Sequence, residues 1–145
     1  MIENEKALIK ELRQFYSATT IKHILHPCNF ETIHEPDGYA DCQNYGGETI
    51  IIGLKLDRGG CIIQIGFWTD GCAATIACGS IATELAEGKS VKEAMSIEAS
   101  DIADALVDLP EGNFHCAEFA ARTLRAALKD CLEISREPWK KLYRK

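Results

Sequence analysis

Two short runs of β-favouring residues, joined by a turn, constrain most strongly what this chain can fold into. The first run covers residues 49–56 and reads TIIIGLKL, and the second covers residues 61–68 and reads CIIQIGFW. Branched and aromatic side chains of this kind suit a pleated, half-buried surface. Between the runs stands Asp57-Arg58-Gly59-Gly60, which is a turn sequence. The sequence therefore predicts an antiparallel hairpin over about residues 47–69.

Helical patterns occupy both sides of this hairpin. Residues 3–15 and 17–25 have helical spacing, and the second stretch stops before Pro27 because the residue preceding a proline avoids the α region. Residues 26–46 are expected to form a loop with one short edge strand. After the hairpin, four helices are predicted: from residue 73, from the capping box Ser90–Glu93, from residue 100, and over about 115–132. The expected fold is α+β, a small antiparallel sheet covered by C-terminal helices, with further helices at the N-terminus.

Composition narrows the function classes. The 145 residues suit one domain, and the net charge of −6, from 16 basic and 22 acidic residues, argues against nucleic acid as a partner. No apolar run is long enough for a membrane span, and residues 1–6 do not resemble a secretory signal. The expected location is therefore cytoplasmic.

Seven cysteines are the unusual part of the composition. An odd number without an export signal argues against a disulfide framework and favours metal binding or thiol chemistry, although buried inert cysteines are also common. Cys72 falls between a predicted strand and helix, and Cys116 starts the last predicted helix beside His115. Helix N-termini favour thiolates, so these residues form a candidate ligand set for zinc or an iron–sulfur cluster.

A series of short motifs runs in order through the chain. They are HxxxPxN at 23–29, FWTDGC at 67–72, ACGS at 77–80, TEL at 83–85, GKS at 88–90, EA at 93–94, DIA at 101–103, LP at 109–110 and HC at 115–116. The series resembles the IscU/NifU-type iron–sulfur cluster scaffold family from about residue 16 to residue 132. The resemblance implies three parts: an N-terminal helical extension at 1–15, a scaffold domain at 16–134 and a basic tail at 135–145.

The resemblance also implies a function. Proteins of this family accept sulfur from a cysteine desulfurase, collect iron, assemble a labile 2Fe-2S cluster and pass it to apo iron–sulfur proteins, as scaffolds rather than enzymes. Three cysteines normally take part, with an aspartate two residues after the first and a histidine before the third. Cys72 matches the second cysteine, Cys116 the third and His115 the histidine.

The first cysteine is where this sequence departs from the family. Gly46-Gly47-Glu48 aligns with the family's Cys-Gly-Asp, and the nearest cysteine is Cys42. Either Cys42 reaches the site from a lengthened loop, which is the favoured interpretation, or two thiolates act with His115 and Glu48. The candidate metal ligands are therefore Cys42, Glu48, Cys72, His115 and Cys116. The candidate sulfur acceptors are Cys42 and Cys116.

Two further comparisons with the family concern its branches. Residues 109–113 read LPEGN where members served by a dedicated Hsp70-type chaperone have LPPVK, which argues against recognition by such a chaperone. Only 43 residues separate Cys72 from Cys116, which leaves no room for the insertion of the zinc-bound SufU branch.

Two rival functions remain open. Cys116 beside His115 could act in thiol or sulfur transfer without a cluster. The missing first cysteine also suits a divergent, zinc-binding member of the family.

The remaining cysteines and histidines receive structural interpretations. Cys78 and Cys131 are expected to pack in the core, and His23 is expected to be a satisfied structural histidine. Cys28 stands where the family commonly has a basic residue.

Overall fold

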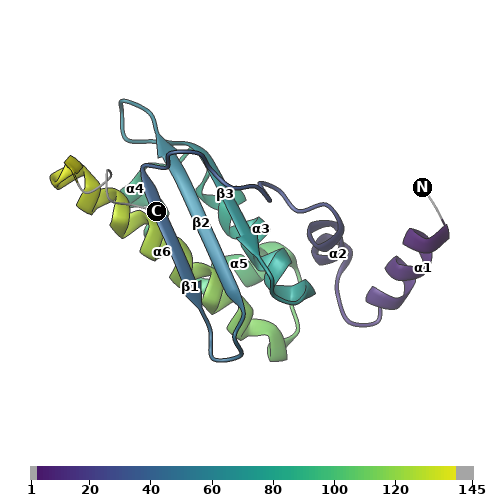
Figure 1. Ribbon diagram of the computed structural model, residues 1–145. Coiled ribbons are helices and arrows are strands. Elements are labelled where there is room, and N and C mark those ends of the chain that lie inside the picture. Colours follow the sequence, from purple (N-terminus) through teal and green to yellow (C-terminus); the bar gives the residue numbers. More distant parts are fainter. Residues whose placement is uncertain (1–2, 140–145) are drawn as a thin grey trace.

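A three-stranded antiparallel sheet forms one layer of the molecule, and helices cover one of its faces (Figure 1). The computed structural model describes residues 3–139, so the ends of the predicted extension and of the basic tail lie outside the described residues. The strands are β1 (Gly38–Gln43), β2 (Thr49–Leu56) and β3 (Ile62–Thr69), in that spatial order. The predicted hairpin and its short edge strand are confirmed, and the fold is α+β.

The turns of the sheet follow from a few polar and glycine residues. The β2–β3 turn is closed by Asp57, whose Oδ1 accepts a hydrogen bond from the Cys61 N–H at 2.9 Å. Between β1 and β2, the Asn44 N–H donates to the Glu48 carbonyl at 3.0 Å and the Glu48 N–H donates to Asn44 Oδ1 at 2.9 Å. Gly47 in this turn has φ +85°, a conformation that favours glycine. The turn ends at Glu48 and fixes where its side chain starts.

The helices are α1 (Glu3–Leu12), α2 (Ala18–Leu25), α3 (Ala73–Ala86), α4 (Val91–Ala94), α5 (Ala99–Leu106) and α6 (Phe114–Arg136), with a 3₁₀ turn at Glu111–Asn113. The predicted capping box is confirmed, because Ser90 and Glu93 bond each other's backbone at 3.1 and 3.0 Å. The first helix ends three residues before the predicted position 15 and buries no side chain. The last helix runs to Arg136, beyond the predicted 132. None of the helices in the described part combines the length and apolar character that crossing a membrane requires.

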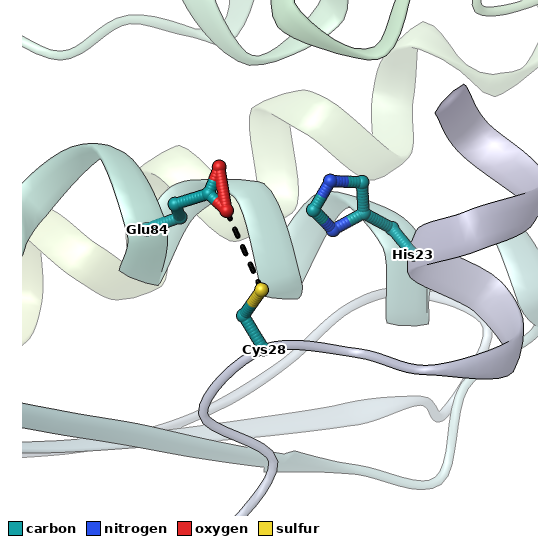
Figure 2. Close-up of side chains that lie close together, drawn as sticks. All are labelled: His23, Cys28 and Glu84. Carbon is teal, nitrogen blue, oxygen red and sulfur yellow. Dashed lines mark hydrogen bonds between the residues drawn. The ribbon is translucent and has the colours of Figure 1, made fainter.

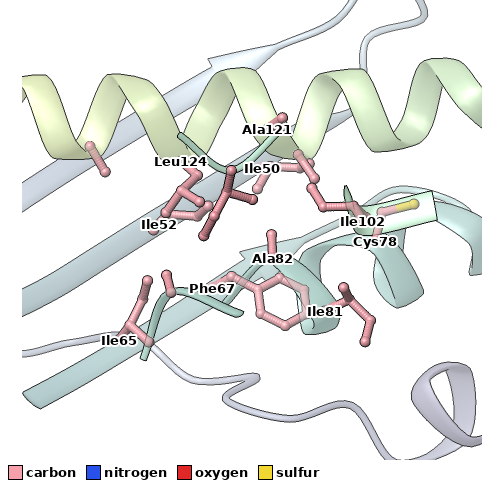
Figure 3. Packing of buried hydrophobic residues seen from close by; sticks show 14 of the residues in the cluster. Ile50, Ile52, Ile65, Phe67, Cys78, Ile81, Ala82, Ile102, Ala121 and Leu124 are labelled. Atoms are coloured by element: carbon pink, nitrogen blue, oxygen red, sulfur yellow. The ribbon is translucent and has the colours of Figure 1, made fainter. Parts of the chain in front are cut away.

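The core lies between the sheet and the helices α3, α5 and α6 (Figure 3). Its largest fully buried members are Phe67, Ile50, Ile52, Leu54, Ile62, Ile65, Ile102, Leu106, Leu124 and Leu128. Cys78 is 0% exposed and Cys131 is 3% exposed within this core, which confirms their predicted packing roles. This packing fixes both α3 and α6 against the sheet, and their N-terminal ends carry Cys72 and Cys116.

Candidate metal centre

Cys72 stands at the junction of β3 and α3. It is the N-cap residue of α3, with φ −72° and ψ 175°, and its own side chain makes no capping hydrogen bond. The residue is exposed. The approach to the helix is held by Asp70, whose Oδ1 accepts from the Thr49 N–H at 2.8 Å. A thiol therefore sits at the open start of a helix, as the sequence predicted.

The hydroxyl of Thr75 connects the predicted site residues. Thr75 Oγ1 lies 3.4 Å from Cys72 Sγ, 3.5 Å from Cys116 Sγ and 3.2 Å from Glu48 Oε1. His115 Nε2 is 3.5 Å from Cys116 Sγ. Three of the five predicted ligand residues, Glu48, Cys72 and Cys116, thus meet at one buried hydroxyl, and a fourth, His115, contacts Cys116.

Three hydrogen bonds hold the Glu48 carboxylate in place. Its Oε2 accepts from the Cys72 N–H at 2.9 Å, and its Oε1 accepts from Asn44 Nδ2 at 3.0 Å as well as from Thr75. Burial alone raises the pKa of this carboxyl, but the hydrogen bonds from Cys72, Asn44 and Thr75 outweigh it and the pKa is lowered overall. An ionised carboxylate therefore caps α3 from the neighbouring turn, where the helix dipole favours negative charge.

The sequence predicts a thiolate at Cys116, because the residue starts a helix. The structure does not favour that ionised form. The residue is only 1% exposed. Burial raises the pKa of the Cys116 thiol, and the charges of Cys72 and Glu48 act in the same direction, against a lowering by the Thr75 hydrogen bond. Burial outweighs the helix terminus here, so in the metal-free chain this residue is a neutral thiol whose proton a metal ion would displace.

A cavity of about 660 Å³ opens beside these groups. Its walls include Cys72, His115 and Glu48, together with Tyr45, Phe119 and Arg122. The cavity brings solvent to one side of the site while the core closes the other. A bound ion would therefore be held by protein on one side and remain within reach of partners on the other.

Residues 15–137 match the NifU-like N terminal domain family. The chain belongs to this family. Over 118 residues it is 41% identical to "Iron-sulfur cluster assembly scaffold protein IscU 1" of Archaeoglobus fulgidus, covering 79% of this chain and 75% of that protein. It is 33% identical over 119 residues to the IscU scaffold protein of Escherichia coli, covering 79% of this chain and 92% of that protein.

Solved structures show the same fold. The N-terminal part of a nitrogen-fixing NifU-like protein from Brucella abortus superposes with a TM-score of 0.57 at 20% identity, covering 87% of this chain and 97% of that chain. A SUF-system protein from Fervidobacterium islandicum gives a TM-score of 0.67 at 20% identity, covering 80% of this chain and 98% of that chain.

In this member of the NifU-like family, Cys42 lies on a strand rather than in the lengthened loop that the sequence suggested. It pairs with Ile50 across β1 and β2, and its half-buried side chain packs against the core cluster. Among the described residues, neither Cys42 nor Cys116 lines the cavity, but Cys116 contacts Thr75 and His115. The role of Cys42 as a ligand stays a prediction.

Sequence reasoning did not find Thr75. The only available signal was its position three residues after Cys72, one helical turn along an otherwise apolar segment. Tyr16 packs against the core cluster, and its pKa is raised by burial and, to a smaller extent, by the charges of Cys72, Cys116 and Cys78.

Proposed function

We propose that this chain is an iron–sulfur cluster assembly scaffold, which receives iron and sulfur, holds a labile 2Fe-2S cluster and passes it to apo-proteins. The carrying observation is that Cys72, Cys116 and Glu48 meet at the Thr75 hydroxyl beside an open cavity, with His115 in contact with Cys116. The relatives named as scaffolds, 41% and 33% identical to this chain, support the same role.

The proposed ligands are the two thiolates, the imidazole and the carboxylate of this group. Iron–sulfur clusters are held by cysteine thiolates, with histidine replacing cysteine in some centres. A carboxylate is a harder and weaker partner for such a cluster. A set with only two thiolates therefore suits a cluster that must leave, and the position of Cys42 on β1 supports this set over one that includes Cys42.

Access decides which thiol would receive sulfur first. Cys72 is exposed, whereas Cys116 is 1% exposed. In the proposed step a scaffold thiolate attacks the outer sulfur of a persulfide on the donor protein. A new S–S bond forms on the scaffold and the donor leaves as a thiolate. Two electrons from an external reductant then convert the transferred sulfur into sulfide. This route adds Cys72 to Cys116 and Cys42 as a sulfur acceptor.

The proposed role implies two kinds of partner. A cysteine desulfurase supplies the persulfide, and apo iron–sulfur proteins take the product. Because relatives of this chain are named as scaffold proteins, we propose a scaffold rather than an enzyme, acting in the cytoplasm.

A zinc-binding member of the same family is the second candidate. The observation that favours it is that two cysteines, Cys72 and Cys116, meet at Thr75 where the family has three, because two thiolates, an imidazole and a carboxylate also suit zinc. Zinc occupancy alone does not separate the two functions, since a thiolate site also binds zinc when it serves another purpose.

Transfer of a cluster separates them. The chain is loaded anaerobically with iron, cysteine and a cysteine desulfurase, and then mixed with an apo-protein that requires a 2Fe-2S cluster. The scaffold function predicts that the visible absorption of the cluster moves to the acceptor, and that Cys72→Ser abolishes the transfer. A chain that takes up zinc but never yields an iron–sulfur chromophore would contradict the proposal. Cys61→Ser is the matched control, because Cys61 is free and half-buried, away from this site.

A further inference from the structure

A second cluster of metal-ligating side chains lies between α2 and α3 (Figure 2). It consists of His23, Cys28 and Glu84, which offer one ligand atom each, all within 4.8 Å of one another. Figure 2 shows the imidazole and the carboxylate on either side of the Cys28 sulfur, with the sulfur and the carboxylate joined by a hydrogen bond of 3.4 Å. The sequence alone suggests no role for Cys28 and a structural role for His23.

This cluster is separate from the candidate centre at the start of α3. Cys72 caps the N-terminus of α3, and Glu84 lies twelve residues further along the same helix. At a rise of 1.5 Å per residue, the two positions are about 18 Å apart along the helix axis. One metal ion therefore cannot serve both places.

The backbone around the cluster is held firmly to α3. Ser80 Oγ lies 2.7 Å from His23 Nδ1 and accepts a hydrogen bond from the Cys28 N–H at 2.8 Å. The next residue, Asn29, donates from Nδ2 to Thr83 Oγ1 at 3.2 Å. The imidazole and the thiol are thus positioned relative to the helix that carries Glu84. Such outer contacts orient the ligands of a metal.

The distance between the thiol and the carboxylate suits a cation. In a tetrahedral zinc site, bond lengths of about 2.3 Å to sulfur and 2.0–2.2 Å to oxygen place these two ligand atoms about 3.6 Å apart. Cys28 Sγ and Glu84 Oε2 are 3.4 Å apart, with the thiol proton between them. A cation that replaces this proton joins a thiolate to a carboxylate, which compensates the charge of both.

The burial of the three residues gives the site a closed and an open side. His23 is buried, Cys28 is half-buried and Glu84 is exposed. Burial lowers the pKa of the His23 imidazole, and a neutral imidazole is the form that binds metals. Water can fill a fourth position on the exposed side, as it does in zinc sites with three protein ligands.

We propose that His23, Cys28 and Glu84 form a second metal-binding site, which takes a divalent transition-metal ion of zinc-like preference. The proposal does not depend on the cluster scaffold function, because it rests on residues near the opposite end of α3 from Cys72. Thiolate, imidazole and carboxylate together exclude magnesium and calcium, which prefer oxygen ligands alone.

Cobalt(II) is the probe for this site, because its thiolate bonds give a charge-transfer absorption and its tetrahedral complexes give intense visible bands. The experiment uses the full chain with Cys72→Ala and Cys116→Ala, which lacks the two thiols of the first centre. We expect this chain to bind one equivalent of cobalt with both signals. Cys28→Ser should abolish the charge-transfer band, while the matched variant Cys61→Ser should keep it. Ser80→Ala should weaken binding about 10- to 100-fold, as loss of an outer contact does.

Two results would overturn the proposal. One is a parent chain without a thiolate–cobalt band, and the other is a band that stays unchanged in Cys28→Ser. Glu84→Gln provides a second test in case Cys28→Ser fails to fold. The Glu84 side chain is exposed, so replacing its carboxylate leaves the core intact. A tenfold or larger loss of affinity in Glu84→Gln supports the site even if Cys28→Ser is unfolded, and an unchanged affinity contradicts it.

Discussion

At the scale of single residues, the centre depends on one hydroxyl that is not itself an expected ligand. Thr75 is fully buried, and its Oγ1 touches Cys72, Cys116 and Glu48. Each of these groups comes from a different part of the chain. The hydroxyl therefore acts as the spacer that sets the distances between them in the metal-free protein.

Replacement of Thr75 by valine tests this positioning role. Valine keeps the shape but removes the hydroxyl, so the thiols and the carboxylate lose their common partner. We expect zinc to bind this centre about 10- to 100-fold more weakly in Thr75→Val, and Thr75→Ser to stay near the parent. Competition with a chromogenic chelator, in a Cys28→Ser chain, measures the affinity at this centre alone. Equal affinities in all three chains would show that the hydroxyl only fills space.

Glu48 predicts a pH dependence of stability. Its pKa in the folded chain lies below the unfolded value of 4.5. A group with a lowered pKa contributes stability that is complete above the unfolded pKa and is lost as the pH falls through the folded pKa. The metal-free parent should therefore exceed Glu48→Gln in stability at pH 6, and the difference should shrink below about pH 4.5. Urea unfolding with chelator across pH 3–7 checks this, and a pH-independent difference would contradict it.

At the scale of elements, the pairing of strands explains which site residues could be predicted from the sequence. Cys72, His115 and Cys116 stand at element boundaries marked by strand and helix patterns, so their approach to one another could be expected. The position of Cys42 could not, because it depends on whether residues 38–43 pair with β2 as a strand. A stretch with Gly38 and polar residues gives little β signal by itself, and pairing with Ile50–Leu54 decides its structure.

The packing of α3 against β3 sets the position of Cys72. A substitution at Gly79 tests this packing. A Cβ at Gly79 would lie 2.6 Å from the ring of Phe67, which is buried and cannot move away (Figure 3). We expect Gly79→Ala to destabilise the fold by about 1–3 kcal/mol through overpacking. Thermal unfolding should show a lower Tm. The control is Gly112→Ala, where no atom lies within 4 Å of the added carbon. Equal Tm values for the two variants would contradict this close packing.

At the scale of the whole molecule, α1 stands apart from the remainder of the fold (Figure 1). It buries no side chain, and a pair formed by half-buried Glu5 and exposed His26, 3.5 Å apart, joins it to the residue after α2. Surface pairs of this kind contribute at most about 1 kcal/mol. The sequence predicts an N-terminal extension at 1–15 and a domain from residue 16, and the family match covers residues 15–137.

Removal of residues 1–12 tests this division. Because no core contact is lost, we expect the shortened chain to keep its unfolding free energy within about 1 kcal/mol of the full chain. Chemical denaturation of both chains measures the difference. A loss of several kcal/mol would mean that α1 belongs to the folded domain.

If the chain is a scaffold, the centre at Cys72 and Cys116 must hold iron and sulfide. The most direct measurement is therefore iron, zinc and acid-labile sulfide per chain after anaerobic reconstitution with a cysteine desulfurase. We expect equal iron and sulfide in the parent chain and in Cys42→Ser, and neither in Cys72→Ser or Cys116→Ser. Loss in Cys42→Ser as well would restore Cys42 as a ligand. Zinc without sulfide in every chain would contradict the scaffold function.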